Sequence, residues 1–183
     1  MAKYVKDILI PREELDAMCR RLGEQISRDY AGEEIILVGV LKGAYVFMAD
    51  LARYITVPVR VDFMAMSSYG SQTRTSGVVK ILKDVDQDIS GSHVLVVEDI
   101  IDSGLTLKKL VELLSTRNPA SIALCTAFDK PFRRKVEIEV KYKGMEVPNE
   151  FIVGYGLDFN GEYRNLPDVC VLGDTNKEET DGE

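Results

Sequence analysis

Two apolar runs that each lead through a turn into a helical pattern restrict the fold of this chain more than any other feature. The run Ile35–Val40 is continuous and apolar, as in a strand covered on both faces, and residues 44–55 after it have a helical pattern. The run His93–Val97 is similarly apolar, and a helix is expected after it at Leu105–Ser115. This alternation predicts an α/β fold with a mostly parallel, twisted sheet flanked by helices. The ligand crevice is then expected at the carboxyl ends of the strands.

The rest of the chain supplies further elements of the same kind. Apolar residues at helical spacing, with two glutamates near the start, predict a helix over residues 12–30. The stretch SSYGSQTRTSG is rich in Ser, Thr and Gly, which predicts a mobile loop. No internal repeat and no clear linker interrupts the 183 residues, so we expect one domain covering residues 1–183. Further strands are predicted at 59–66, 78–82, 122–127, 151–155 and 169–172.

Composition narrows the class of function. Apolar residues make up 45% of the chain and charged residues 29%, which is typical of globular proteins rather than disordered or membrane proteins. A net charge of −7 disfavours nucleic acid as a partner, because a broad duplex-binding surface needs clustered Lys and Arg. Any anionic ligand must therefore be held locally. The sequence contains neither a signal-peptide core nor a membrane-spanning run, which favours a cytoplasmic location.

Cysteine and histidine form no obvious catalytic or metal site in the sequence. Cys19, Cys125 and Cys170 lie far apart in apolar surroundings, as expected of reduced packing residues. The only histidine, His93, opens a strand-like run and leaves no obvious base for a Cys-His pair. The same scarcity of ligands weakens the case for zinc.

The stretch HVLVVEDIIDSGLTLKKL, residues 93–110, carries the most chemical information. An apolar strand delivers Glu98 and Asp99 to its end, and a third carboxylate, Asp102, follows in the turn that opens a helix. Small residues in this turn leave backbone N–H groups exposed at the helix N-terminus, where an anion is stabilised. The pattern therefore predicts a phosphate cradle beside a pair of acids.

A purely structural interpretation of this turn is also available. Asp102 or Ser103 could cap the helix while Glu98 and Asp99 complement its dipole. Capping accounts for one acid, but it does not readily account for two adjacent carboxylates at the mouth of a crevice. Like charges there disfavour each other unless a metal or ligand hydroxyls compensate. The acid pair favours a binding function, and capping stays open for Asp102.

Several motifs, in order and spacing, resemble one known family. The segment VVEDIIDSGLT resembles the phosphoribosyl-pyrophosphate signature of type I phosphoribosyltransferases, in their hypoxanthine-guanine branch. LVGVLKGAYVFMADL, SSYGSQTRTSG, DKPFRR and EFIVGYGLDFNGEYRNLP resemble its pyrophosphate loop, mobile loop, purine-binding segment and C-terminal segment. The likeness covers about residues 35–172. It implies the type I phosphoribosyltransferase fold with a small hood, which we expect from the N-terminal segment and parts of 130–167.

The resemblance implies a purine salvage transferase. Its substrates would be phosphoribosyl pyrophosphate and a 6-oxopurine base, hypoxanthine and also guanine, and its products IMP or GMP and pyrophosphate. Magnesium would be the cofactor, and the family commonly forms dimers or tetramers, so a homo-oligomer is expected. The resemblance leaves the preference among hypoxanthine, guanine and xanthine open.

The same resemblance assigns the phosphoribosyl pyrophosphate site. The 5′-phosphate would be held by the turn amides and hydroxyls, while Glu98 and Asp99 would face the ribose hydroxyls and the water shell of a magnesium ion. Family members often have a non-prolyl cis peptide at the position of Leu41-Lys42. One departure is Leu105, where the family often has Lys. The implied residues are Glu98, Asp99, Asp102, Ser103, Gly104, Leu105, Thr106, Leu41, Lys42, Gly43 and Arg164.

The resemblance also assigns the base and the catalytic groups. Asp102 matches the aspartate near purine N7 and is the candidate general base. Ser68 and Tyr69 match the Ser-Tyr pair of the mobile catalytic loop, which excludes water on closing. Lys130 would donate to the 6-oxygen, which favours hypoxanthine or guanine over adenine. Asp158 would bind a second magnesium ion. The implied purine-binding residues are Lys130, Phe151, Ile152 and Asp158.

Two other functions compete with this one. A regulator could keep this fold to sense nucleotides and bind RNA or DNA, although the acidic balance and the intact set of site residues disfavour it. A phosphotransfer or dinucleotide-binding domain would also place carboxylates at strand ends, but the sequence contains neither GxxxxGK[ST] nor GxGxxG after its first strand.

Overall fold

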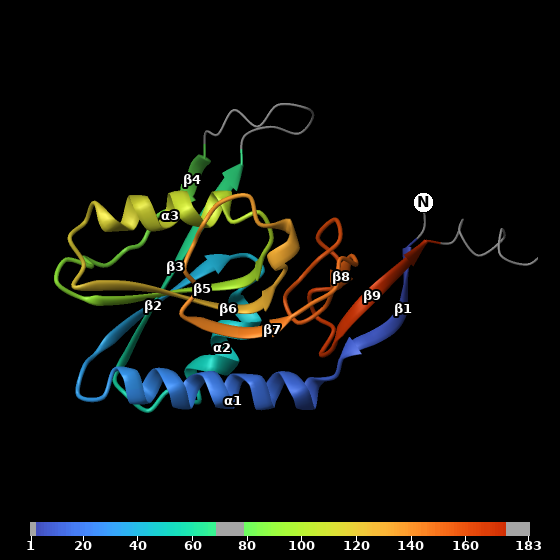
Figure 1. Cartoon of the computed structure of the whole chain (residues 1–183), viewed down its shortest axis with the longest axis horizontal. Coiled ribbons are helices and arrows are strands. Elements are labelled where there is room, and N and C mark those ends of the chain that lie inside the picture. The colour runs from blue at the N-terminus through green and yellow to red at the C-terminus, as the bar shows by residue number, and fades with distance from the viewer. Residues whose placement is uncertain (1–2, 69–78, 175–183) are drawn as a thin grey trace, which may run out of the picture.

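The computed structural model describes residues 3–68 and 79–174, arranged as two sheets and their covering helices (Figure 1). Within these ranges, none of the helices is long and apolar enough to cross a membrane. The strands are β1 (Lys3–Ile10), β2 (Ile35–Leu41), β3 (Val59–Ser68), β4 (Val79–Lys83), β5 (His93–Ile101), β6 (Ser121–Asp129), β7 (Tyr142–Glu146), β8 (Ile152–Val153) and β9 (Val169–Asp174). The helices are α1 (Arg12–Asp29), α2 (Tyr45–Ala52), α3 (Leu105–Ser115) and the short 3-10 helix η1 (Pro131–Arg133).

The main sheet has six strands in the order β4-β3-β2-β5-β6-β7. All neighbouring pairs are parallel except β3 and β4, which form an antiparallel edge. The prediction of an α/β fold with a mostly parallel sheet is therefore confirmed. The direction in which successive strands are added to the sheet reverses between β2 and β5. Folds of this kind bind ligands in the crevice at the carboxyl ends of the two strands where this reversal occurs.

Helices cover both faces of this sheet because its central strands are apolar on both sides. Alternate side chains of β2 and β5, such as Leu37 and Leu95, pack against the buried sides of α1 and α2. The intervening side chains, such as Val38 and Val96, pack against α3. Figure 1 shows α3 on one side of the sheet and α1 and α2 on the other. Burying one such aliphatic side chain contributes roughly 1.5–3 kcal/mol, so these faces hold the strand ends firmly.

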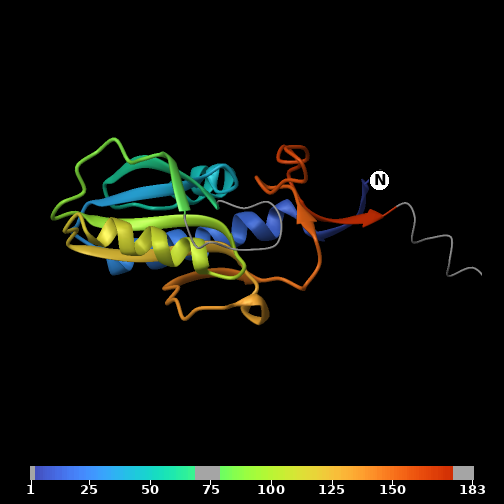
Figure 2. The same cartoon turned by 90° about the horizontal axis from the view of Figure 1, so that it is seen from above.

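A second, antiparallel sheet of three strands, in the order β1-β9-β8, lies at one end of the molecule (Figures 1 and 2). It joins the N-terminal segment to strands on both sides of residues 154–168. Helix α1, in contrast, packs under the main sheet. The small sheet adjoins the segment that carries several expected site residues, and the division into one domain with a hood stays a prediction.

The strands differ from those expected mainly at β1, β5, β7 and β8, and the other boundaries differ by one or two residues. Strands β1 and β7 were not predicted, and β5 continues four residues past Val97 to Ile101. The strand expected at residues 151–155 is reduced to β8, because Gly154, Tyr155 and Gly156 all have positive φ angles, of 90°, 51° and 95°. Most of the loop predicted at SSYGSQTRTSG lies outside the described residues.

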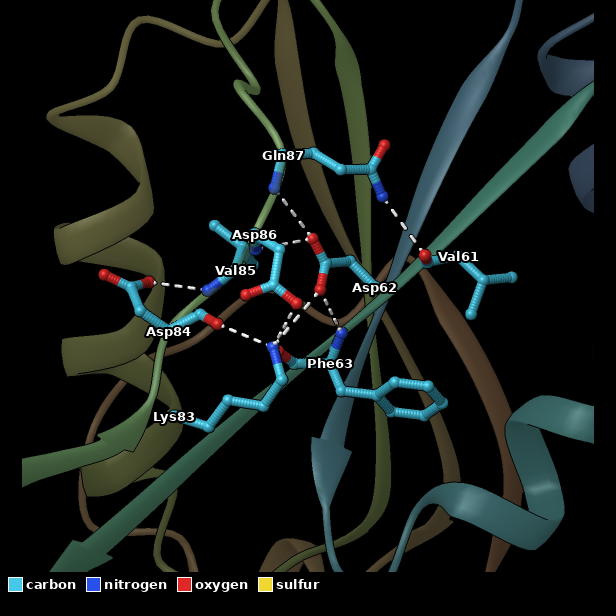
Figure 3. Close-up of polar contacts among 8 residues, drawn as sticks. All are labelled: Val61, Asp62, Phe63, Lys83, Asp84, Val85, Asp86 and Gln87. Atoms are coloured by element: carbon cyan, nitrogen blue, oxygen red, sulfur yellow. Dashed lines mark hydrogen bonds and ion pairs between the residues drawn. The ribbon is translucent and has the colours of Figure 1, made fainter.

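A buried carboxylate ties β3 to the chain that follows β4 (Figure 3). Asp62 accepts hydrogen bonds from the N–H groups of Phe63, Asp86 and Gln87, at 2.7, 2.8 and 3.1 Å. The Lys83 ammonium lies 3.6 Å from the same carboxylate. Burial raises the pKa of Asp62, but the three N–H donors and Lys83 outweigh it, so the pKa lies below its ordinary value. This network fixes the base of the β3–β4 hairpin.

Candidate active site

The acid pair lies within β5, at the point where this strand separates from β2. The β2–β5 pairing ends at Gly39 and Val97, whereas β5 remains paired with β6 as far as Ile101 and Asp129. The N–H group of Asp99 donates a hydrogen bond of 3.2 Å to the Glu98 carboxylate, so the two acids lie together at this point. Both acids therefore border the crevice from inside the strand, and the turn begins only at Asp102.

Burial and mutual repulsion make this acid pair unfavourable as two bare charges. Burial, followed by the charge of Asp99, raises the pKa of Glu98 well above its ordinary value. Burial also raises the pKa of Asp99, against the opposing effects of its hydrogen bond with Glu98, of the Ile100 N–H and of the positive charge of Arg164. Among the described residues, no Lys or Arg forms an ion pair with either acid. Such a pair suits a ligand that brings a cation or hydroxyl donors.

A pocket of about 150 Å³ lies at the turn after β5, and we call it the phosphate pocket. Helix α3 begins beyond Gly104, whose φ of 78° is in the left-handed region that favours glycine. No side chain caps this helix end, so its first N–H groups remain available to a ligand. The described residues that line the pocket are Glu98, Ile100, Ile101, Asp102, Ser103, Gly104, Thr106 and Leu107.

Asp102 is not the N-cap of α3, which answers the structural alternative. Gly104 is the N-cap, and the Ser103 hydroxyl accepts only a long hydrogen bond, 3.4 Å, from the Leu105 N–H. The Asp102 carboxylate instead lies 2.8 Å from Nε of Arg133. The Asp102 carboxylate therefore pairs with Arg133 and does not cap the helix.

A second pocket, of about 260 Å³, adjoins the first, and we call it the base pocket. Asp102 and Ile100 line both pockets, so the two share a wall. All four residues expected to bind the purine line the base pocket, although they come from segments far apart in the chain. The described lining residues are Asp99, Ile100, Asp102, Lys130, Arg133, Phe151, Ile152, Leu157 and Asp158.

Lys130 and Phe151 are presented to the base pocket in different ways. Lys130 is only 5% exposed, and its ammonium donates a hydrogen bond of 2.7 Å to the carbonyl of Glu150. Burial lowers the pKa of Lys130, against the attraction of Asp102. Phe151 is 55% exposed, and its ring forms a T-shaped contact with the ring of Phe159, at 5.6 Å between centroids. Lys130 thus provides a buried hydrogen-bond donor, and Phe151 provides an exposed aromatic ring.

The expected pyrophosphate loop lies beside the acid pair. The Leu41-Lys42 peptide is cis, as the resemblance implied. A Cβ atom on Gly43 would overlap the carboxylate of Asp99, so only glycine allows this approach. Leu41, Lys42 and Gly43 are not among the described residues that line the two pockets, and neither is Leu105.

Arg164 and Asp158 form an ion pair at the other side of the base pocket. Nη2 of Arg164 lies 2.7 Å from the Asp158 carboxylate, and Nη1 donates to the Gly156 carbonyl at 2.6 Å. The other Asp158 oxygen accepts from the Gly161 N–H at 2.7 Å. Within residues 3–68 and 79–174, no three Asp, Glu, His or Cys side chains gather closely enough to bind one metal ion. Among the described residues, Asp158 thus forms no three-ligand cluster with the acid pair, although Asp99 also lines the base pocket.

Two expected catalytic residues are at the edge of what the structure describes. Ser68 is the last residue of β3, and Tyr69 lies outside the described residues. Sequence reasoning missed Arg133, which lines the base pocket and contacts Asp102. The segment DKPFRR contained a signal for it, since two cations follow Lys130 closely, but only Lys130 was assigned a contact.

Comparison with known proteins agrees with this geometry. A family model described as the phosphoribosyl transferase domain matches residues 11–160. The chain is 52% identical over 169 residues to a hypoxanthine phosphoribosyltransferase of Salmonella typhimurium, covering 91% of this chain and 95% of that one. It is 49% identical over 174 residues to a hypoxanthine-guanine phosphoribosyltransferase of Mycobacterium tuberculosis, covering 92% and 86%.

Solved structures extend the agreement to the fold. The crystal structure of a hypoxanthine-guanine phosphoribosyltransferase from Bacillus anthracis matches with a TM-score of 0.89 and 47% identity, covering 94% of this chain and 100% of that one. A hypoxanthine phosphoribosyltransferase from Staphylococcus aureus matches with a TM-score of 0.89 and 44% identity, covering 92% of each chain. Because sequence and fold agree over nearly the whole length, the chain belongs to the phosphoribosyl transferase family.

Proposed function

We propose that this protein transfers the 5-phosphoribosyl group of phosphoribosyl pyrophosphate to hypoxanthine, and to guanine as a second base. The products are IMP or GMP and pyrophosphate. One observation carries the proposal: the phosphate pocket and the base pocket share Asp102 and Ile100 as a common wall. A nucleotide has its phosphate and its base at opposite ends of a ribose. A pocket at a helix start that adjoins a pocket lined by Lys130 and Phe151 is suited to such a ligand. The names of the similar proteins point to the same reaction.

The sugar phosphate binds mainly through main-chain donors in this proposal. The N–H groups at the start of α3 and the hydroxyls of Ser103 and Thr106 hold the 5′-phosphate. Glu98 and Asp99 accept hydrogen bonds from the ribose hydroxyls. The cis peptide Leu41-Lys42, with Gly43, contacts the pyrophosphate through its backbone.

Bond exchange at ribose C1′ needs a base for the purine proton. N9 of the purine attacks C1′, the bond from C1′ to the pyrophosphate oxygen breaks, and pyrophosphate leaves with the electron pair. Asp102 accepts the proton from N7, which makes the attacking nitrogen more nucleophilic. Its position in both pockets places it beside the base and near the sugar. The contact with Arg133, at 2.8 Å, orients its carboxylate.

The base pocket favours a 6-oxopurine. Lys130 donates to the 6-oxygen, where adenine would present an amino group. Phe151 stacks on the purine ring, and Ile152 offers main-chain hydrogen bonds. Rejection of adenine follows, because a buried donor without an acceptor costs about 1–3 kcal/mol.

Magnesium fits the residues of this site. Its first candidate ligands are Glu98 and Asp99, whose raised pKa values and lack of a Lys or Arg partner among the described residues suit a bound cation. Asp158 would hold a second ion, in exchange for its pairing with Arg164, which then turns to the pyrophosphate. When bound, magnesium would neutralise the charge of the leaving pyrophosphate.

Three further assignments complete the proposal. Ser68 and Tyr69 belong to a loop that closes over the reacting centre and excludes water. The protein acts in the cytoplasm. It forms a homo-oligomer, a dimer or a tetramer.

A base-panel assay tests the function directly. Purified, folded protein is supplied with phosphoribosyl pyrophosphate, magnesium and hypoxanthine, guanine, xanthine or adenine in turn, and products are identified by mass. We expect IMP and GMP with release of pyrophosphate, and no AMP. Absence of any nucleotide product would defeat the proposal, and nucleotide-sensitive binding to RNA or DNA without turnover would favour a regulator instead.

A further inference from the structure

The turn that forms the phosphate pocket is held from behind by one other segment. Its carbonyl groups at Ile101 and Ser103 each accept a hydrogen bond of 3.0 Å, from the N–H groups of Lys130 and Lys135. Between them, the Asp102 carbonyl accepts a longer one, of 3.5 Å, from Nη1 of Arg134. Three successive carbonyls of the turn are thus bound by residues 130–135.

Arg134 is fixed in place by a carboxylate deeper in the fold. Its Nη2 pairs with Asp129, the last residue of β6, which is only 1% exposed. The Arg134 side chain is itself 18% exposed. Its stem also lies against the turn, because a Cβ atom on Gly104 would come within 3.2 Å of Cδ of Arg134. One side chain therefore contacts both the Asp102 carbonyl and Gly104.

Peptide geometry connects these contacts with phosphate binding. In a planar trans peptide, the carbonyl of one residue and the N–H of the next point in opposite directions. Holding the carbonyls of Asp102 and Ser103 from behind therefore turns the N–H groups of Ser103 and Gly104 toward the phosphate pocket. Amides fixed before binding lose less entropy when the ligand arrives.

We propose that Arg134, anchored by Asp129, is a positioning residue for the phosphate turn and so determines affinity for the 5′-phosphate. This inference rests on the proposed function. Among the described residues, the Arg134 guanidinium contacts the Asp102 carbonyl and the Asp129 carboxylate. Within that part of the chain, it contacts no other group of the base pocket. Its loss should therefore affect the phosphate end of a nucleotide more than the base end.

The test compares ligands that differ only in the phosphate. Dissociation constants for IMP and inosine are measured by calorimetry or competition for the wild-type protein and for Arg134→Met and Arg134→Lys. Lys keeps a positive charge beside Asp129, so this variant should still fold. It lacks the planar fork of Arg and therefore cannot donate to both acceptors. The matched control is Arg117→Met. This substitution breaks the ion pair between Arg117 and Asp84, which has an N–O distance of 2.7 Å and lines neither pocket.

We expect the ratio of the dissociation constant of inosine to that of IMP to fall about tenfold in Arg134→Met. The ratio should fall by a smaller factor in Arg134→Lys. The dissociation constant of inosine should stay within twofold of wild type in both variants. Arg117→Met should leave the ratio unchanged. An unchanged ratio in a folded Arg134 variant, or equal weakening of both ligands, overturns the inference. If Arg134→Met does not fold, Arg134→Lys decides. Failure of wild-type protein to form IMP would defeat the proposed function but not this result, because the ratio does not depend on turnover.

Discussion

The two pockets of this site are built in opposite ways. The described lining of the phosphate pocket comes from one continuous stretch, Glu98–Leu107, and contains no Lys or Arg. The base pocket is assembled from three segments, residues 99–102, 130–133 and 151–158, and contains Lys130 and Arg133. Under the proposed function, phosphate binding therefore depends on the path of the main chain, whereas base binding depends on particular side chains. Changes to backbone geometry and changes to side-chain chemistry should therefore have separable effects.

Asp102→Asn should have the largest effect, because Asp102 belongs to both pockets and supplies the base in the proposed mechanism. Asparagine keeps the shape and loses the basicity. We expect kcat to fall by about 10²–10⁴, the usual contribution of a general base. Steady-state kinetics should show KM for phosphoribosyl pyrophosphate within a few-fold of wild type. A kcat near that of wild type would remove Asp102 from the proton transfer.

Gly104→Ala should come next and should act on the phosphate side alone. The residue has a φ of 78°, and an added Cβ would lie 3.2–3.3 Å from the side chains of Arg134, Val136 and Ile138. Displacing this turn should raise KM for phosphoribosyl pyrophosphate by about tenfold to a hundredfold. KM for hypoxanthine should change little.

A matched control for this substitution is available in Gly32→Ala. Gly32 also has a positive φ, of 86°, but nothing lies within 4 Å of its added Cβ. This control should lower the melting temperature through backbone strain and leave both KM values unchanged. If the two glycine variants alter KM equally, the phosphate turn has no special function.

Lys130→Gln should act on the base side, with a smaller effect. Replacing the buried ammonium should weaken binding of hypoxanthine by about 1.5–3 kcal/mol, the range for a lost hydrogen bond to a charged group. Product ratios in mixtures of hypoxanthine and adenine should shift toward adenine. An unchanged ratio would show that Lys130 does not select the base.

The pH dependence of base binding offers a second measurement on Lys130. Burial lowers the pKa of Lys130. Its ammonium therefore loses the proton at a pH below the ordinary lysine pKa of about 10.4. Affinity for hypoxanthine should therefore fall as the pH rises through the alkaline range toward that value. The difference between wild type and Lys130→Gln isolates this step from ionisation of the base itself. The same fall in both proteins would exclude Lys130 as its cause.

Asp62→Asn should leave both pockets unchanged and reduce stability. It weakens a buried network of three N–H donors, at a cost of about 1–3 kcal/mol in the free energy of unfolding at pH 7. Because the folded-state pKa of Asp62 is lowered, its contribution is present above the unfolded value of about 3.9 and is lost as pH falls through the folded value. Urea unfolding between pH 3 and 7 checks this. Equal pH dependence in both proteins would contradict it.

The contrast between the pockets also explains what could be predicted from sequence. The phosphate turn was predicted because a single stretch holds the strand, the acids, the small residues and the helix start. The strands of the sheet centre were predicted because they are apolar on both faces. The family resemblance, confirmed by the comparisons, joined the distant residues of the base pocket, which no local pattern connects.

What sequence could not supply depends on contacts between distant segments. Strand β1 carries charged residues and is a strand because it pairs with β9. The apolar run of β5 ends at Val97, yet pairing with β6 continues the strand past Glu98 and Asp99. Arg134 has the usual appearance of a surface cation, and only the structure shows that it pairs with buried Asp129 and contacts the Asp102 carbonyl.

A crystal structure with IMP bound would show whether one nucleotide occupies both pockets. We expect phosphate oxygens within hydrogen-bonding distance of the main-chain N–H groups after Asp102, the 6-oxygen at Nζ of Lys130, and N7 facing the Asp102 carboxylate. A nucleotide whose phosphate lies away from the start of α3, or whose base lies outside the pocket of Lys130 and Phe151, would contradict it.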